Sequence, residues 1–304
     1  MKGRKSSVLT IAEKCKNILA SNWRGSLNTI KADSKGSKGE IYTSKVKYFV
    51  KKGKPYIWVP GNDLHNVNTI IDERSSFAVS SPFPGMAYLL KSIKKLPARV
   101  ALTGDVVRLE KITSATESLK EIVSLEEKIV KESGYSVSGI LGSSHLGATP
   151  RGHNLKELLE GNNQYIIYKF NVSSCSYIDG NGSTHEVELE EFEESKADPL
   201  SPFSASLIDG INRSEIRRRA LILLCITQLK NNLKDALLLR IDRKGFDMLG
   251  KIVGPLRNDG SFEYQWKEFR ITFEEEARHV EAFCERLVQL EEEAIKSVSS
   301  FSGL

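Results

Sequence analysis

The chain has 304 residues, of which 40% are hydrophobic and 27% are charged. This balance excludes collagen-like, disordered and disulfide-rich classes and indicates a soluble globular protein long enough for two domains. No apolar run approaches the ~20 residues that a transmembrane helix needs, so we expect no membrane span.

The net charge of +5 is unevenly distributed along the chain. Residues 1–58 hold fourteen Lys or Arg against three acidic residues, whereas residues 186–198 hold seven acidic residues against one lysine. The basic part predicts an anionic partner. It has no arginine-rich run and no interleaved stacking aromatics, so we expect no nucleic acid; a bounded anion such as a phosphate or a propionate fits better.

The cysteines and the N-terminus bear on the compartment. Cys15, Cys175, Cys225 and Cys284 are far apart and form no C-x-x-C pair, which predicts a reducing compartment. Residues 1–16 are basic but include Glu13, which makes them a poor transit peptide. We therefore expect either a cytoplasmic protein or one whose leader precedes this sequence.

The first half of the chain has the composition of an antiparallel meander. Turn residues separate five strand-like segments, and a short helical segment lies between the third and fourth strands. In that segment Asp63 is a helix cap, and Leu64, Val67, Ile70 and Ile71 form an apolar stripe that we expect to plug the meander. The predicted strands are residues 25–32, 40–50, 54–60, 75–81 and 99–110.

A long helix, a hairpin and a linker are predicted next. The helix covers about residues 114–134, and the hairpin strands flank the turn DGNGS at residues 179–183. The acidic stretch 190–204, which contains Ser and Pro, reads as a linker. We therefore expect a ligand-binding domain at residues 1–195 and a smaller α/β domain at residues 196–304.

The predicted second domain runs helix, strands, helix. Residues 211–231 are amphipathic, the following strands bend at Lys244-Gly245, and residues 264–273 alternate as a strand. We expect Thr272, with Glu275, to cap the last helix. In that helix an apolar stripe packs on the core through Val280, Phe283, Leu287, Leu290 and Ala294.

The sequence contains no dinucleotide, P-loop, zinc-protease or nucleophile-elbow motif, and its histidines lack the spacing of zinc ligands. The alternation of Lys45 and Lys47 puts both lysines on one strand face. The segment SHLGATPRGH reads as a glycine-rich loop suited to an anionic edge, although a plain solvated loop explains it as well. The candidate ligand residues are Lys45, Lys47, His65, Arg74, His145, Arg151 and His153.

The ordered set of these segments resembles a known family. SLNTI, SKVKY, GKPYIWVPGNDLHNVNTIIDERSSFAV and LPARVALTGDVVRLE resemble the FMN-binding split barrel of the pyridoxamine phosphate oxidase-like superfamily. ALLLRIDRKGFDMLGKIV, FRITF and the last helix resemble the domain appended to HugZ-type haem-binding proteins. Their plant relatives include the glutamyl-tRNA reductase-binding proteins. The expected fold is therefore α+β: an antiparallel split β-barrel with short helices and a smaller C-terminal α/β domain.

The resemblance implies a homodimer whose barrels share their ligand clefts, with FMN in some relatives and haem in HugZ-type members. Arg151 is the position that matches an arginine supporting the haem. Bacterial members commonly carry a histidine element where this chain has Ile211 to Glu215, which lack histidine. Iron held by water or by a barrel-loop histidine such as His145 is then the expectation.

The resulting prediction is a haem-binding dimer that degrades haem oxidatively within tetrapyrrole metabolism, as a haem oxygenase-like oxidoreductase. Lys45, Arg74 and Arg151 would offset the propionates, and His65, His145 or His153 would contact the iron side directly or through water. No catalytic residue is assigned. An FMN-dependent oxidoreductase and a non-enzymatic regulator of a tetrapyrrole-pathway enzyme remain open. The plant relatives indicate a chloroplast, with the cytoplasm as the alternative.

Overall fold

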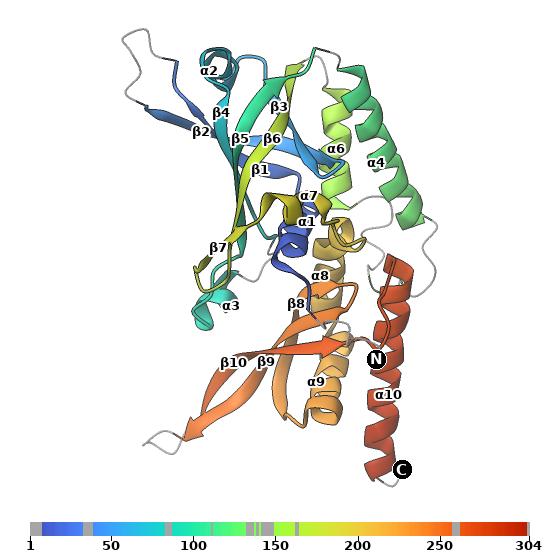
Figure 1. Cartoon of the computed structure of the whole chain (residues 1–304). Helices are drawn as coiled ribbons and strands as arrows, with labels where there is room; N and C mark the ends of the chain where they lie inside the picture. The colour runs from blue at the N-terminus through green and yellow to red at the C-terminus, as the bar shows by residue number, and fades with distance from the viewer. Residues whose placement is uncertain are drawn as a thin grey trace, which may run out of the picture.

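The fold is α+β, as the sequence predicts (Figure 1). It consists of an antiparallel barrel with short helices, followed by a smaller C-terminal sheet with its own helices. The computed structural model describes residues 8–32, 39–82, 87–110, 112–131, 137, 140, 149–161, 164–256 and 262–302.

Six strands close into the barrel. They run antiparallel in the order β3-β2-β1-β4-β5-β6, and pairing of β3 with β6 completes the ring. A short strand, β7 (Thr184–Val187), extends the sheet beyond β6. The predicted meander and hairpin are thus confirmed. The six barrel strands are β1 (Arg24–Ile30), β2 (Ile41–Lys51), β3 (Lys54–Pro60), β4 (Arg74–Ser80), β5 (Arg99–Arg108) and β6 (Tyr165–Ile178).

The barrel interior is filled by alternate side chains of these strands, as the period of two requires. Leu27, Tyr48, Phe77 and Phe170 are fully buried there. Helix α1 (Ile11–Ser21) packs against this core, and the Tyr48 hydroxyl donates to the Leu19 carbonyl of α1 at 2.7 Å. The helices α3 (Ala87–Ser92) and α7 (Leu189–Glu194) flank the barrel near β7 (Figure 1).

Helices cover one outer side of the barrel. Phe49, Trp58 and Ile167 point outward from β2, β3 and β6 and form a core with α4 (Thr113–Lys131) and α6 (Pro150–Glu160). On the opposite side, over β4 and β5, Figure 1 shows no helix lying across the strands.

The C-terminal sheet has the order β10-β9-β8 and packs on helices. Its core also takes in Leu89 and Leu90 of α3 and Val130 of α4, so it is continuous with elements of the first half. Its elements are η3 (Ser201–Phe203), α8 (Ser204–Arg213), α9 (Glu215–Leu229), β8 (Leu233–Asp242), β9 (Gly245–Leu256), β10 (Phe262–Thr272) and α10 (Val280–Ser302).

The predicted start of the last helix was wrong. Thr272 is the final residue of β10 and pairs with Gly245, so its backbone is extended instead of capping a helix. The chain stays beside the β8–β9 turn as far as Ala277, whose N–H donates to the Arg243 carbonyl. Helix α10 begins at Val280, and the His279 ring accepts from the Ala282 N–H at 3.1 Å, which is the role of an N-cap.

Among the described residues, no helix is both long enough and apolar enough to cross a membrane.

Candidate functional site

The polar side of helix α2 (His65–Ile71) faces the barrel. His65 is fully buried, with Nδ1 2.8 Å from the Thr29 hydroxyl and Nε2 3.0 Å from the Ser44 hydroxyl. Asn68 donates to the same Thr29 oxygen at 2.9 Å, and a neutral His65 ring that accepts from the Thr29 hydroxyl at Nδ1 and donates from Nε2 to Ser44 gives every one of these groups a partner. Burial lowers the pKa of His65, which favours this neutral ring.

The apolar side of α2 faces outward, contrary to the expectation that it plugs the meander. Leu64, Val67, Ile70 and Ile71 are between 53% and 74% exposed, and Ile41 of β2 is also exposed. The hydrogen bonds of His65 and its neighbours, and not the apolar stripe, determine the orientation of α2. These polar groups find hydrogen-bond partners only on the side of the helix that faces the barrel. We call these five side chains the apolar rim. Exposed apolar side chains gathered on one element are typical of an interaction surface.

The outward side chains of β1, β4, β5 and β6 are small and mostly polar. The strand register aligns them in two rows across the sheet, and each row is exposed or half-buried. Hydrogen bonds run along the second row, including Asn28 to Ser76 at 2.9 Å and Thr103 to Ser174 at 2.5 Å. We call this surface the bare face. Its rows are Ser26, Ala78, Ala101 and Ser176, and then Asn28, Ser76, Thr103 and Ser174.

Three basic residues border the bare face at β1 and β2. The ladder pairs Arg24 with Lys47 and Ser26 with Lys45, so all four side chains point outward together. Lys45 Nζ donates to the Ser26 hydroxyl at 2.6 Å, and Lys47 pairs with Glu157 of α6 at 3.2 Å. Among the described residues, Arg24 and Lys45 have no acidic partner. We call Arg24, Lys45 and Lys47 the basic corner, which is suited to an anionic group.

Arg24 is a member of the basic corner that the sequence reasoning missed. Its side chain matters because it lies directly opposite Lys47, and that proximity depends on the β1–β2 register. The predicted turn of seven residues between these strands does not fix a register, so the sequence alone could not pair the two positions.

His153 and Arg74 lie apart from each other. His153 is on α6 with Nδ1 3.6 Å from Glu157, so it shares that carboxylate with Lys47 beside the basic corner. Arg74 begins β4 and forms an exposed ion pair with Asp72 at 2.6 Å. The structure therefore brings His153 close to Lys47, and it puts His65 and Arg74 elsewhere.

Arg151 is buried at the start of α6. It forms an ion pair with Glu126 of α4 and donates to the Asn22 carbonyl at 3.2 Å. Burial raises the pKa of Glu126, and the nearby Arg151 opposes that rise. A role of Arg151 at a propionate stays a prediction.

Part of the predicted glycine-rich loop is helical. Thr149 caps α6 by accepting from the Gly152 N–H at 2.9 Å, and Pro150 occupies the first turn. Arg151 and His153 therefore lie on a helix, whereas His145 lies outside the described residues.

A flat cofactor fits the bare face better than any metal ion held by side chains alone. The small side chains let a planar ring approach the strands, the apolar rim adds contact area, and the basic corner offers counter-charges for an acidic edge. The outward rows contain no histidine in the described strands. Throughout the described ranges, no group of three or more His, Cys, Asp or Glu side chains is arranged to hold a metal.

Comparison with known proteins gives matches only among solved structures. No protein-family model and no curated protein matches the chain. A haem-binding protein from Mycobacterium smegmatis is similar to it with a TM-score of 0.54 and 19% identity, over 96% of this chain and 99% of that one. The chain has a split-barrel fold.

Other solved structures that match have lower TM-scores. A protein from Clostridium acetobutylicum, related to general stress protein 26 and described as of the pyridoxinephosphate oxidase family, has a TM-score of 0.36 and 9% identity. That match covers 60% of this chain and 96% of that one. Protein Atu2129 from Agrobacterium tumefaciens, of unknown function, has a TM-score of 0.39 and 16% identity, over 95% and 100% of the two chains.

Proposed function

We propose that the chain is a homodimeric split-barrel protein that binds haem between two barrels and degrades it oxidatively within tetrapyrrole metabolism. The observation that carries this proposal is the pair of unpartnered surfaces on one barrel, the apolar rim of α2 and the bare face. Neither surface is covered by another element among the described residues. A second copy of the chain would cover both and leave a flat cleft between them.

The choice of haem is supported by the extent of the fold match. The similarity to the haem-binding protein from Mycobacterium smegmatis covers 96% of this chain and therefore extends over the barrel and the C-terminal sheet together. The division into residues 1–195 and 196–304 remains part of this proposal. The proposed compartment is the chloroplast, with the cytoplasm as the alternative.

Each residue set has a defined part in the proposed site. Arg24 and Lys45 hold the propionates by charge-assisted hydrogen bonds, and the small residues of the bare face orient the ring. The dimer contact through the apolar rim excludes water from the cleft. Bound haem would supply the activation of oxygen or peroxide, with its iron held by water or by His145.

FMN is the second candidate, because the basic corner suits a phosphate. Arg24 and Lys45 with the Ser26 hydroxyl form a donor set that would hold a phosphate as well as a propionate. A flavin-dependent oxidoreductase would use the same cleft.

A titration with hemin and, separately, with FMN tests the proposal. We expect a saturable Soret change with hemin, and a dimer by light scattering during chromatography. Arg24→Gln with Lys45→Gln should weaken hemin binding by about tenfold or more, since hydrogen bonds to charged groups contribute ~1.5–3 kcal/mol. The exposed Lys120→Gln on α4 is the matched control.

Three results would count against haem. They are no saturation with hemin, saturation with FMN alone, or equal hemin affinity in the double variant and the control. A protein that binds neither pigment but is recovered with a tetrapyrrole-pathway enzyme would be the regulator instead.

A further inference from the structure

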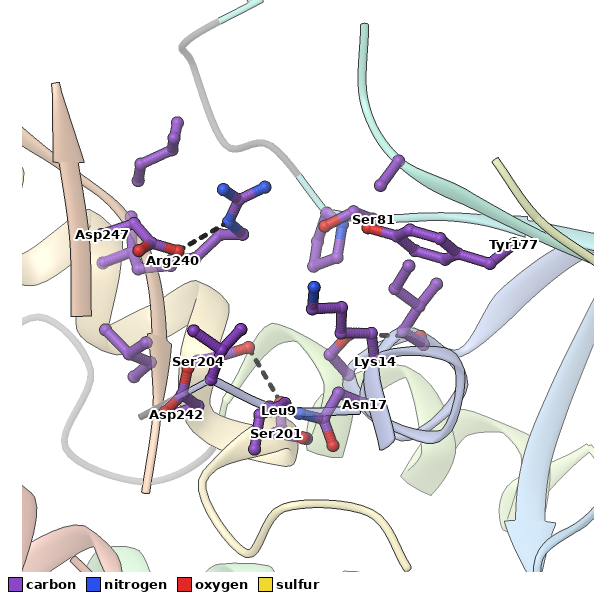
Figure 2. A pocket seen from close by; sticks show the side chains of 18 of the residues that line it. Leu9, Lys14, Asn17, Ser81, Tyr177, Ser201, Ser204, Arg240, Asp242 and Asp247 are labelled. Carbon is purple, nitrogen blue, oxygen red and sulfur yellow. Dashed lines mark hydrogen bonds and ion pairs between the residues drawn. The ribbon is translucent and has the colours of Figure 1, made fainter. Parts of the chain in front are cut away.

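A pocket lies between the barrel and the C-terminal sheet, and none of the three basic-corner residues lines it (Figure 2). Its volume is about 290 Å³. The barrel side is formed by α1 and the end of β6, and the other side by α8, β8 and residues of β9 and β10. A molecule bound in the pocket would therefore touch both halves of the chain.

Most of the pocket wall is apolar. Side chains from α1, α8 and β8 line it, together with residues just before α1 and β5. An apolar ligand body would be removed from water there, which stabilises binding by roughly 25 cal/mol per Å² of buried apolar surface. The apolar lining residues are Val8, Leu9, Ile18, Pro82, Ala98, Ile208, Leu239 and Ile241.

Two polar groups point into the pocket without partners. Figure 2 shows the Lys14 side chain rising between the two sheets and the Tyr177 ring reaching into the same space from the barrel side. Within the described ranges, Lys14 Nζ has no acidic partner and the Tyr177 hydroxyl has no hydrogen-bond partner. Burial raises the pKa of Tyr177, so its hydroxyl remains a donor.

The remaining charges on the wall neutralise one another. Arg270 donates two hydrogen bonds of 2.8 Å to Asp242, and Arg240 donates to Asp247 at 2.9 Å. Lys14 is thus the positive charge in excess. One unpaired cation beside two carboxylates favours a ligand with a single negative charge over a phosphate dianion.

We propose that this pocket binds a small monocarboxylate with an apolar body, its carboxylate held between Lys14 and Tyr177. The volume is the share of roughly ten water molecules at ~30 Å³ each, which suits a medium-length acyl chain and is too small for a porphyrin. This site is separate from the basic corner and does not depend on the proposed haem function. A bound ligand would contact both the barrel and the C-terminal sheet and would stabilise their packing against each other.

Isothermal titration of the full chain with octanoate tests the proposal. We expect saturable binding with a Kd below about 1 mM and at least tenfold weaker binding of 1-octanol, which has the tail without the charge. Lys14→Met should weaken octanoate binding about tenfold, and Tyr177→Phe should weaken it about fivefold, through the loss of one charged partner and one neutral partner. Lys120→Met on the exposed surface of α4 is the control and should bind as the wild type does.

Four results would overturn the proposal. They are octanoate binding weaker than about 1 mM, equal affinity of octanoate and 1-octanol, tighter binding of inorganic phosphate than of octanoate, and wild-type affinity in Lys14→Met. Circular dichroism of both pocket variants checks that they are folded. Hemin titration of Lys14→Met should match the wild type, which separates failure here from failure of the haem proposal.

Discussion

Helices α2 and α10 both carry an apolar stripe, yet they turn it in opposite directions. In α10 the stripe is inside: Val280, Phe283 and Leu287 are buried in the C-terminal core. In α2 the stripe is outside, and Ile70 and Ile71 are more than 70% exposed. The two helices differ in their other side, because α10 has charged residues that remain in water and α2 has His and Asn side chains that bond to the barrel.

The difference indicates what each stripe is for. A stripe that the same chain buries contributes to folding, and a stripe that it leaves exposed has its partner elsewhere. Substitutions in the two helices should therefore change different quantities.

The largest effect is expected in α10. Phe283→Ala removes a fully buried ring and leaves a cavity, so the free energy of unfolding should fall by about 3–5 kcal/mol. Urea denaturation measures it. Ile216→Ala, at an exposed position of α9, should change stability by less than about 0.5 kcal/mol. Equal losses at the two positions would remove the distinction between buried and exposed apolar residues.

The polar side of α2 should give the next effect. Asn68 accepts from the Ala32 N–H and donates to the Thr29 hydroxyl, both at 2.9 Å. Asn68→Ala removes the side-chain partner of the Ala32 N–H and one of the two side-chain partners of the Thr29 hydroxyl, and should cost about 1–3 kcal/mol in the same denaturation experiment. An unchanged midpoint would mean that these hydrogen bonds do not orient the helix.

His65 should give a smaller effect that depends on pH. Burial lowers its pKa in the folded protein, so the unfolded chain binds the proton more readily. Stability should fall as the pH drops below about 6.5 and level off only below the folded pKa. Chemical denaturation between pH 7 and pH 5 should show a shallower loss for His65→Gln than for the wild type. The control is His153→Gln, at a mostly exposed position.

The apolar rim should give the smallest change in stability of the single subunit. Ile70→Ser combined with Ile71→Ser should change the free energy of unfolding of the subunit by less than about 0.5 kcal/mol, because both side chains already lie in water. The same variant should sediment as a monomer at concentrations where the wild type is a dimer. Ile216→Ser, another exposed isoleucine, should leave association unchanged. A rim variant that still associates would show that α2 is not the contact.

Much of the fold could be predicted from sequence because its signals are local. Alternating segments between turn residues predicted the barrel strands, and the stripe from Val280 to Ala294 predicted the buried side of α10. The start of α6 was also encoded, since Thr149-Pro150 is an N-cap followed by proline, but the surrounding glycines favoured a loop interpretation.

The candidate site was less predictable because it depends on contacts between distant residues. The orientation of α2 is set by Thr29 and Ser44, which come from two other strands. Likewise, only the fold brings Arg151 to Glu126 and places Tyr177 and Lys14 in the wall of one pocket. Periodicity shows that a helix has two sides, and it does not show which side has hydrogen-bond partners in the rest of the chain.

Because β3 pairs with β6, every strand of the ring has a neighbour on both sides. A second chain therefore cannot extend the ring by backbone pairing, and contacts through the bare face involve side chains only. Two subunits joined in this way can separate and re-form without breaking a sheet. One edge strand of the C-terminal sheet is β10, where the charged side chains of Lys267, Glu268 and Arg270 discourage the edge-to-edge pairing that leads to aggregates.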